Sequence, residues 1–251
     1  MRRIDLNADV GESLGPWRLG DDEALLDVVT SANIACGFHA GDPCVMEATV
    51  RAAAARGVAI GAHPGYPDLG GFGRRSMRIA PGDVARMVLY QIGALGAFCR
   101  GLGARMAHVK PHGALYNDAA EDPDLAAAIA SAAGRYDSSL IVVGLAGSAM
   151  APAVAAAGLR FAAEAFCDRA YRPNGALEPR AEPGATLQSA AEACAQAIDI
   201  ALRGRVVTPG GDCIDVAADT LCIHGDTPRA PDLARAVRAA LLHEGVTLSA
   251  L

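Results

Sequence analysis

The chain has 251 residues, of which 52% are hydrophobic but only 4% aromatic, and its formal net charge at pH 7 is -6. This length is enough for one large α/β domain with a core of aliphatic side chains. The acidic balance argues against nucleic acid or an anionic membrane surface as the main partner. The sequence shows neither an apolar run of the roughly 20 residues that span a bilayer nor a signal-peptide pattern. We therefore expect a cytoplasmic protein, with seven reduced cysteines.

Apolar runs alternate with amphipathic segments along the chain, which predicts repeated strand–helix units. The expected strands are 4–8, 31–35, 58–62, 105–109, 140–145, 160–165 and 220–223. The expected helices are 21–30, 42–56, 81–100, 122–133, 148–157, 186–203 and 228–244. Two long loops, 63–80 and 167–185, interrupt this alternation, and loops of such length are usually functional. A Pro-Gly-Gly turn predicts a β-hairpin insert at about 206–216.

The strand patterns indicate a parallel sheet that is covered on both faces, because they are nearly continuous apolar runs. A glycine-rich nucleotide fingerprint does not follow the first strand, and the G-x-x-x-x-G-K-[ST] pattern does not occur. Polar residues at so many strand ends also converge more easily in a ring than along an open edge. We therefore expect one domain, 1–251, folded as a seven-stranded, distorted (β/α) barrel.

Polar and titratable residues recur where the predicted strands stop. In a parallel barrel the carboxyl ends of the strands share one face, and that face carries the chemistry. The candidate site residues are Asn7, Asp9, Glu12, Asn33, His39, His63, Lys110, His112, Glu164, Asp168, Arg169, Arg172, His224 and Asp226.

The first strand ends in two carboxylates and an amide. Asp9 and Glu12 are suited to general acid–base catalysis, and the alternative is ordinary turn chemistry. Asn7 and Asn33 fall inside strand patterns, where asparagine is disfavoured, and this favours a functional role.

Two histidines, His39 and His63, follow neighbouring predicted strands. With Asp9 they form one possible set of ligands for a divalent metal. The alternative is that the imidazoles are neutral hydrogen-bonding or substrate-binding groups. The sequence does not favour the metal, because it contains neither an H-x-x-H nor an H-E-x-x-H pattern.

Lys110 is the only lysine among 22 basic residues, and it lies between His108 and His112. A lysine there is suited to neutralising an oxyanion or a phosphate; the alternative is a solvent-facing lysine beside a structural histidine. Arg169 and Arg172 suit a carboxylate or phosphate group, or else a solvated loop.

Asp226 and its neighbour His224 close the predicted ring. Asp226 is placed either to orient an imidazole or to cap the last helix, and the sequence leaves both roles open.

Seven segments carry long and specific motifs from the first strand to the last helix: 5–12, 31–43, 60–66, 71–75, 108–116, 168–171 and 224–227. Together they resemble the LamB/YcsF family. The resemblance implies a barrel of the glycoside hydrolase/deacetylase type. It also implies a subunit of an ATP-dependent 5-oxoprolinase, which opens the lactam of 5-oxo-L-proline to L-glutamate with partner subunits B and C. ATP and Mg²⁺ are then expected to be handled together with those partners.

The resemblance implies roles for the candidate residues, and these roles form a hypothesis. Asp9 or Glu12 activates water, Lys110 with His39 and His63 stabilises the developing charge, and Arg169 or Arg172 holds the substrate carboxylate. His112 is counted among the catalytic residues. The remaining candidates are assigned to substrate binding: Asn7, Asn33, Glu164, Asp168, His224 and Asp226. Two alternatives stay open, a metal-dependent carbohydrate deacetylase and a non-catalytic substrate-binding subunit.

Overall fold

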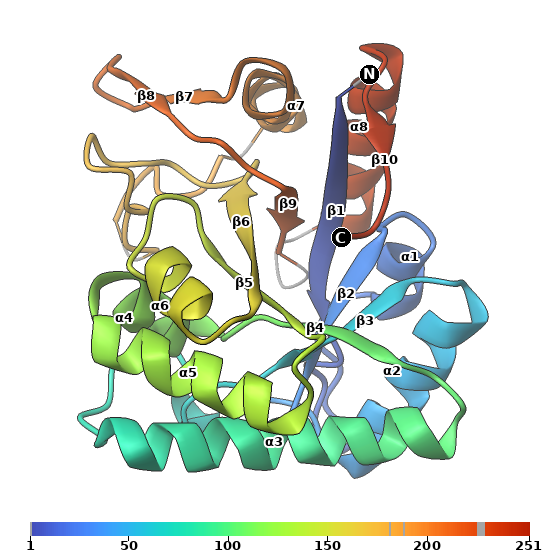
Figure 1. The fold of residues 1–251 in the computed structure, drawn as a ribbon. Helices are drawn as coiled ribbons and strands as arrows, with labels where there is room; N and C mark the ends of the chain where they lie inside the picture. Colours follow the sequence, from blue (N-terminus) through green and yellow to red (C-terminus); the bar gives the residue numbers. More distant parts are fainter. Residues whose placement is uncertain (1, 181, 188, 225–228) are drawn as a thin grey trace.

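The computed structural model describes residues 2–180, 182–187, 189–224 and 229–251. Seven parallel strands form a closed barrel in this part of the chain (Figure 1). They are β1 (Arg3–Val10), β2 (Ser31–Ala35), β3 (Ala59–His63), β4 (Met106–Val109), β5 (Ile141–Leu145), β6 (Arg160–Phe166) and β9 (Thr220–Ile223). Strand β9 pairs with both β6 and β1, and this second pairing closes the ring. The predicted seven-stranded (β/α) barrel is confirmed.

The helices lie outside the ring of strands (Figure 1). They are α1 (Asp22–Leu26), α2 (Pro43–Ala55), α3 (Pro81–Gly101), α4 (Gly113–Glu121), α5 (Pro123–Tyr136), α6 (Met150–Ala156), α7 (Ala190–Ile198) and α8 (Ala230–His243). The two long helices α3 and α5 lie side by side (Figure 1). Within the described ranges, none of the helices has both the length and the apolar character that crossing a bilayer requires.

Asp-Pro pairs begin two of these helices. Asp42 and Asp122 each accept hydrogen bonds from two backbone N–H groups of the turn that follows. Pro43 and Pro123 occupy the first helical position, where the missing N–H costs nothing. These aspartates satisfy N–H groups that would otherwise lack partners in the first turn.

The structure shortens two predicted helices and adds one that was not predicted. Helix 21–30 is only α1, and Thr30, four residues beyond its end, donates to Asp5 Oδ1 at 2.6 Å. Helix 186–203 begins four residues late, at Ala190, and its last turn is the π-helix η2 (Asp199–Arg203). Helix α4 was not predicted, because nine residues are too few to show a clear helical period.

The remaining elements are short and lie at the rim of the barrel. Strands β7 (Arg205–Val207) and β8 (Cys213–Asp215) pair antiparallel, and β10 (Thr247–Leu248) adds to β1. A 3-10 turn, η1 (Leu69–Gly71), lies in the first long loop. The assignment of 1–251 to a single domain stays a prediction.

Strand β1 shows how the barrel divides polar from apolar side chains. Side chains alternate along a strand, so Asp5, Asn7 and Asp9 share one face. All three are buried, and they hydrogen-bond across the ring to other strands. The intervening Leu6 and Ala8 belong to the apolar core, which includes residues of the surrounding helices. The lumen of the barrel is therefore polar.

Candidate active site

Lys110 lies at the centre of the polar lumen. It follows β4, and its ammonium group is 2.9 Å from both Asp9 Oδ1 and Glu164 Oε1. It also donates to Asn7 Oδ1 at 3.3 Å and to Cys222 Sγ at 3.0 Å. Since Lys110 is only 2% exposed, this cation is held almost entirely by protein groups.

Two asparagines and a histidine connect the strands around this cation. The Asn33 amide donates to Asn7 Oδ1 at 2.7 Å and to Asp9 Oδ1 at 2.9 Å. The other side of that amide, Asn33 Oδ1, accepts from His108 Nε2 at 2.8 Å. Asn7 donates in turn to Glu164 Oε1 at 2.9 Å. We call Asp5, Asn7, Asp9, Asn33, His108, Lys110 and Glu164 the lumen network.

Electrostatics hold the ion pair at the centre of this network charged. Burial acts to raise the pKa of Asp9, but His63 and Lys110 hold it well below its usual range. Burial acts to lower the pKa of Lys110, but Asp9, Cys222 and Glu164 raise it well above its usual range. At neutral pH a carboxylate and an ammonium group therefore face each other in a water-poor lumen.

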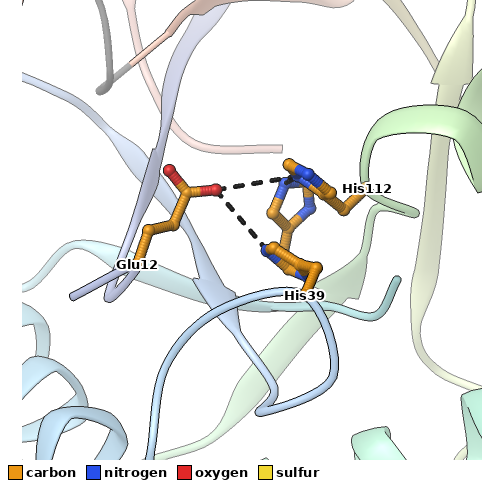
Figure 2. A group of neighbouring side chains, drawn as sticks. Glu12, His39 and His112 are labelled. Carbon is orange, nitrogen blue, oxygen red and sulfur yellow. Dashed lines mark hydrogen bonds and ion pairs between the residues drawn. The ribbon is translucent and has the colours of Figure 1, made fainter. Parts of the chain in front are cut away.

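A second group of side chains lies at the mouth of the barrel, and we call Glu12, His39, His63 and His112 the mouth cluster. Figure 2 shows the Glu12 carboxylate pointing toward two of these imidazoles. Glu12 Oε1 is 3.5 Å from His39 Nε2 and 3.7 Å from His112 Nδ1. His63 Nε2 is 3.0 Å from His112 Nδ1. All four residues are buried.

The mouth cluster brings together four donor atoms that suit a metal ion. One ligand atom from each residue lies within 4.8 Å of the other three. Burial and the neighbouring imidazoles lower the pKa of His39 and of His112 well below the usual range, so these rings are neutral and have lone pairs to offer. This group can hold a metal. The ligand set considered from the sequence was Asp9, His39 and His63. The mouth cluster contains both of these histidines, with Glu12 and His112 in the place of Asp9.

His224 closes the other side of the mouth. Its Nδ1 lies 3.0 Å from Asp168 Oδ2, and its ring stacks on Phe166 with centroids 5.2 Å apart. Burial acts to raise the pKa of Asp168, but His224 lowers it below its usual value. Asp168 therefore orients an imidazole, a role that the sequence did not assign to it. Asp226 lies outside the described residues.

A cavity of about 640 Å³ connects the two groups with the loop that follows β6. Asp9, Glu12 and Lys110 line it, together with Arg169 and Arg172. Arg169 also donates to the carbonyls of residues 178 and 185, so it fixes its own loop. Arg172 is exposed and pairs with the Glu178 carboxylate at 3.1 Å.

Some residues of the site were not singled out from the sequence. Cys222 contacts the Lys110 ammonium group, and Thr220 bonds both Asp5 and Asn7. The signal was the alternation of polar residues along β1 and β9, which predicts one inward-facing row on each strand. Cys222 and Thr220 lie within β9, whereas the residues predicted from sequence were mostly those at strand ends.

Residues 4–251 match the LamB/YcsF family. A relative from Methylococcus capsulatus, called the A subunit of 5-oxoprolinase, is 56% identical over 250 residues, which are 100% of this chain and 96% of that protein. The crystal structure of a lactam utilization protein from Thermus thermophilus has a TM-score of 0.94 at 48% identity, covering 99% and 100% of the two chains. A structure described as T48 deacetylase with substrate has a TM-score of 0.50 at 13% identity, covering 98% and 87%, which shows the fold alone.

Fold and site together define a closed parallel (β/α) barrel with a charged lumen that opens into a cavity. The family match and the identities extend along the whole chain, so the resemblance seen in its motifs is confirmed. This chain belongs to the LamB/YcsF family.

Proposed function

We propose that this chain is the A subunit of an ATP-dependent 5-oxoprolinase, which hydrolyses the lactam of 5-oxo-L-proline to L-glutamate. The observation that carries the proposal is the cavity, which combines a buried Lys110–Asp9 ion pair at its base with arginines in the loop above it. A small anionic amide needs both features, a cation for its carboxylate and charged groups at its carbonyl. The names of the full-length relatives support the same substrate.

The substrate carboxylate is proposed to bind at the loop that follows β6. Arginine recognises carboxylates through paired N–H donors. Arg172 is the better candidate, because its side chain is exposed and its present partner, Glu178, belongs to the same loop. Arg169 contributes charge from a buried position, where its pKa is lowered to about 10 by burial and by Arg180.

An unstrained lactam is a poor electrophile, and this is the proposed reason for ATP. Transfer of the γ-phosphoryl group to the lactam oxygen turns that oxygen into a leaving group. Water then adds to the ring carbon, the carbon–nitrogen bond breaks, and the nitrogen takes a proton. This leaves an acyl phosphate, and a second water hydrolyses it, so that the phosphorylated oxygen departs as phosphate and glutamate remains. In total one lactam, one ATP and two water molecules give glutamate, ADP and phosphate.

Glu12 is the better of the two proposed bases for that water. Asp9 is held ionised by Lys110, and a carboxylate with such a low pKa is a weak base. Glu12 lies at the mouth, lines the cavity and is within 4 Å of two imidazoles that can pass a proton onward. Lys110 is then the fixed positive charge that stabilises the developing oxyanion.

Partner subunits B and C are proposed to complete the enzyme. The sequence of this chain has no G-x-x-x-x-G-K-[ST] pattern and no glycine-rich fingerprint after β1. Binding of ATP and Mg²⁺ is therefore assigned to the assembled complex rather than to this chain by itself.

The test is glutamate formation from 5-oxoproline by the purified chain, with and without ATP and with and without the partner proteins. We expect product only when all are present. Glu12→Gln, assembled with the same partners, should lower it about 10²- to 10⁴-fold, while Arg86→Gln on the exposed face of α3 should not. Product from the chain alone without ATP, or acetate release from acetylated sugars, would reject the proposal in favour of a simple amidase or a deacetylase.

A further inference from the structure

Two imidazoles of the mouth cluster face each other in a way that neutral rings do not tolerate. His63 Nδ1 is 2.7 Å from the carbonyl oxygen of Lys110, and His112 Nε2 is 2.8 Å from that of Phe72. A carbonyl only accepts, so both of these nitrogens must carry the hydrogen. The second nitrogen of each neutral ring then presents a lone pair. Those nitrogens, His63 Nε2 and His112 Nδ1, are 3.0 Å apart.

The two lone pairs repel each other at this distance. A positive species between the two nitrogens removes the repulsion, and that species is either a shared proton or a metal ion. The surroundings decide between them. A shared proton needs only the two rings, but two more atoms with lone pairs lie close to the same point. Glu12 Oε1 is 3.7 Å from His112 Nδ1, and His39 Nε2 is 3.5 Å from Glu12 Oε1 (Figure 2). His39 is fully buried, and neither of its ring nitrogens has a hydrogen-bond partner among the described residues.

The separations fit a tetrahedral ion. Bonds of 2.0–2.1 Å to zinc place neighbouring donor atoms about 3.3–3.4 Å apart. Three of the six separations among the four atoms, from His63 through His112 and Glu12 to His39, are 3.0, 3.7 and 3.5 Å. We propose that Glu12, His39, His63 and His112 bind one divalent first-row transition metal ion, of which zinc is the best match. Glu12 is the ligand through Oε1 alone, so its other oxygen, Oε2, keeps the role of the proposed base. Three imidazole nitrogens and one carboxylate oxygen suit zinc, whereas magnesium and calcium prefer oxygen ligands.

The surrounding fold supports the site. Metal-binding histidines generally donate their other N–H to a carbonyl or carboxylate, and His63 and His112 both do so. Two glycines let the loops close over the rings. A Cβ on Gly65 would lie 2.8 Å from His39 Nδ1, and one on Gly73 would lie 2.8 Å from His112 Cδ2.

One adjustment is expected when the ion binds. The rings of His39 and His112 are stacked, with centroids 3.7 Å apart and planes within 4° of each other. Parallel rings cannot direct both lone pairs at one point. His39 is therefore expected to rotate, since its ring nitrogens hold no hydrogen bond within the described part of the chain that would oppose this.

The test measures metal in the isolated full chain, so it does not depend on the proposed lactam hydrolysis. Protein stripped with EDTA is dialysed against excess Zn²⁺, then against metal-free buffer, and its zinc content is measured by mass spectrometry. We expect one zinc per chain, a raised Tm, and a tetrahedral visible spectrum when Co²⁺ replaces Zn²⁺. His39→Asn, His112→Asn and Glu12→Gln should each reduce zinc retention at least tenfold.

Two control variants locate the ion. His243→Asn, on the exposed end of α8, should retain one zinc. His224→Asn alters the other group of possible ligands, Asp9, Cys222 and His224, and should also retain it. Circular dichroism checks that each variant is folded. Loss of zinc with His224→Asn, or undiminished zinc in folded His39→Asn and His112→Asn, would overturn the assignment. Wild-type protein that binds no zinc and shows a doubly protonated His63 by NMR would establish the shared proton instead.

Discussion

The lumen network and the mouth cluster contain the same residue types but differ in how their polar atoms are satisfied. In the lumen, Lys110 has four polar neighbours, and Asn33 uses both ends of its amide. At the mouth, Glu12 Oε1 lies 3.5 Å from His39 Nε2 and 3.7 Å from His112 Nδ1, and the His39 nitrogens have no hydrogen-bond partner among the described residues. Many mutual hydrogen bonds rigidify a buried network, although His108 Nδ1 and Glu164 Oε2 lack a hydrogen-bond partner among the described residues. The unused lone pairs of His39 are available to a ligand. The comparison indicates that the lumen network holds the frame of the site and positions Lys110, whereas the mouth cluster offers groups to a ligand.

The largest effect on stability is expected from Lys110→Met. Removing the ammonium group leaves the carboxylates of Asp9 and Glu164 close together in a buried lumen, and breaking a buried ion pair costs about 3–5 kcal/mol. The free energy of unfolding, measured by urea denaturation, should fall by that amount. The control is Arg86→Met, which removes an exposed pair with Asp83 and should cost less than about 1 kcal/mol. Similar losses in both variants would contradict the distinction.

Acid should destabilise the lumen through His108. Burial, with Lys110 and His63 nearby, lowers the pKa of His108 to about 3, so between about pH 6.5 and 3 the unfolded chain binds more protons than the folded one. The stability that the neutral His108 contributes is complete above about pH 6.5 and is lost as the pH falls. Between pH 6.5 and 4 the loss is on the order of 3 kcal/mol at most.

The matched variant for this pH effect is His108→Gln, whose amide can still donate to Asn33. Urea denaturation at pH 7, 6, 5 and 4 should show a shallower fall in the free energy of unfolding for the variant. Asp9 does not affect this comparison between pH 7 and 4. Because its pKa is lowered in the folded chain, its contribution to the free energy of unfolding is lost only below about pH 4. Identical slopes in the two proteins would show that His108 is not the group responsible.

A smaller cost is expected from Asn33→Ala. The change removes hydrogen bonds to Asn7, Asp9 and His108 and leaves their buried atoms without those partners, which costs about 1–3 kcal/mol. The measurement is again urea denaturation. Asn174→Ala, in the exposed loop after β6, is the matched asparagine control and should change the free energy by less than about 0.5 kcal/mol.

The smallest change in stability, with a large change in activity, is expected at the mouth. Glu12→Gln keeps the shape of the side chain, and Glu12 Oε1 lies 3.5 and 3.7 Å from the nearest nitrogens of His39 and His112, so we expect a stability change within about 1 kcal/mol. Glutamate formation by the complex assembled with its partners should fall about 10²- to 10⁴-fold, as for loss of a general base. A variant that is both strongly destabilised and fully active would place Glu12 in the scaffold instead.

Much of the site could be expected from the sequence, and the reasons it was incomplete are physical. Asn7 and Asn33 stood out because asparagine is disfavoured in strands, and Lys110 because it is the only lysine. His108 was given a structural role as an alternative, whereas Cys222 was not assigned any role in the site. Their importance depends on which side of a strand faces the ring, and the sequence shows this only once the closed barrel is known.

The sequence by itself determined the order of strands and helices, because hydrophobic periodicity and the Asp-Pro helix starts are local signals. It also determined the family. Only the tertiary structure shows that Glu12 and His112 lie with His39 and His63 in one group of possible metal ligands, whereas Asp9 belongs to another such group. Three of these residues follow different strands, and His63 is the last residue of a fourth strand. The distances between them therefore depend on barrel closure and loop packing. Chain spacing does not encode such distances.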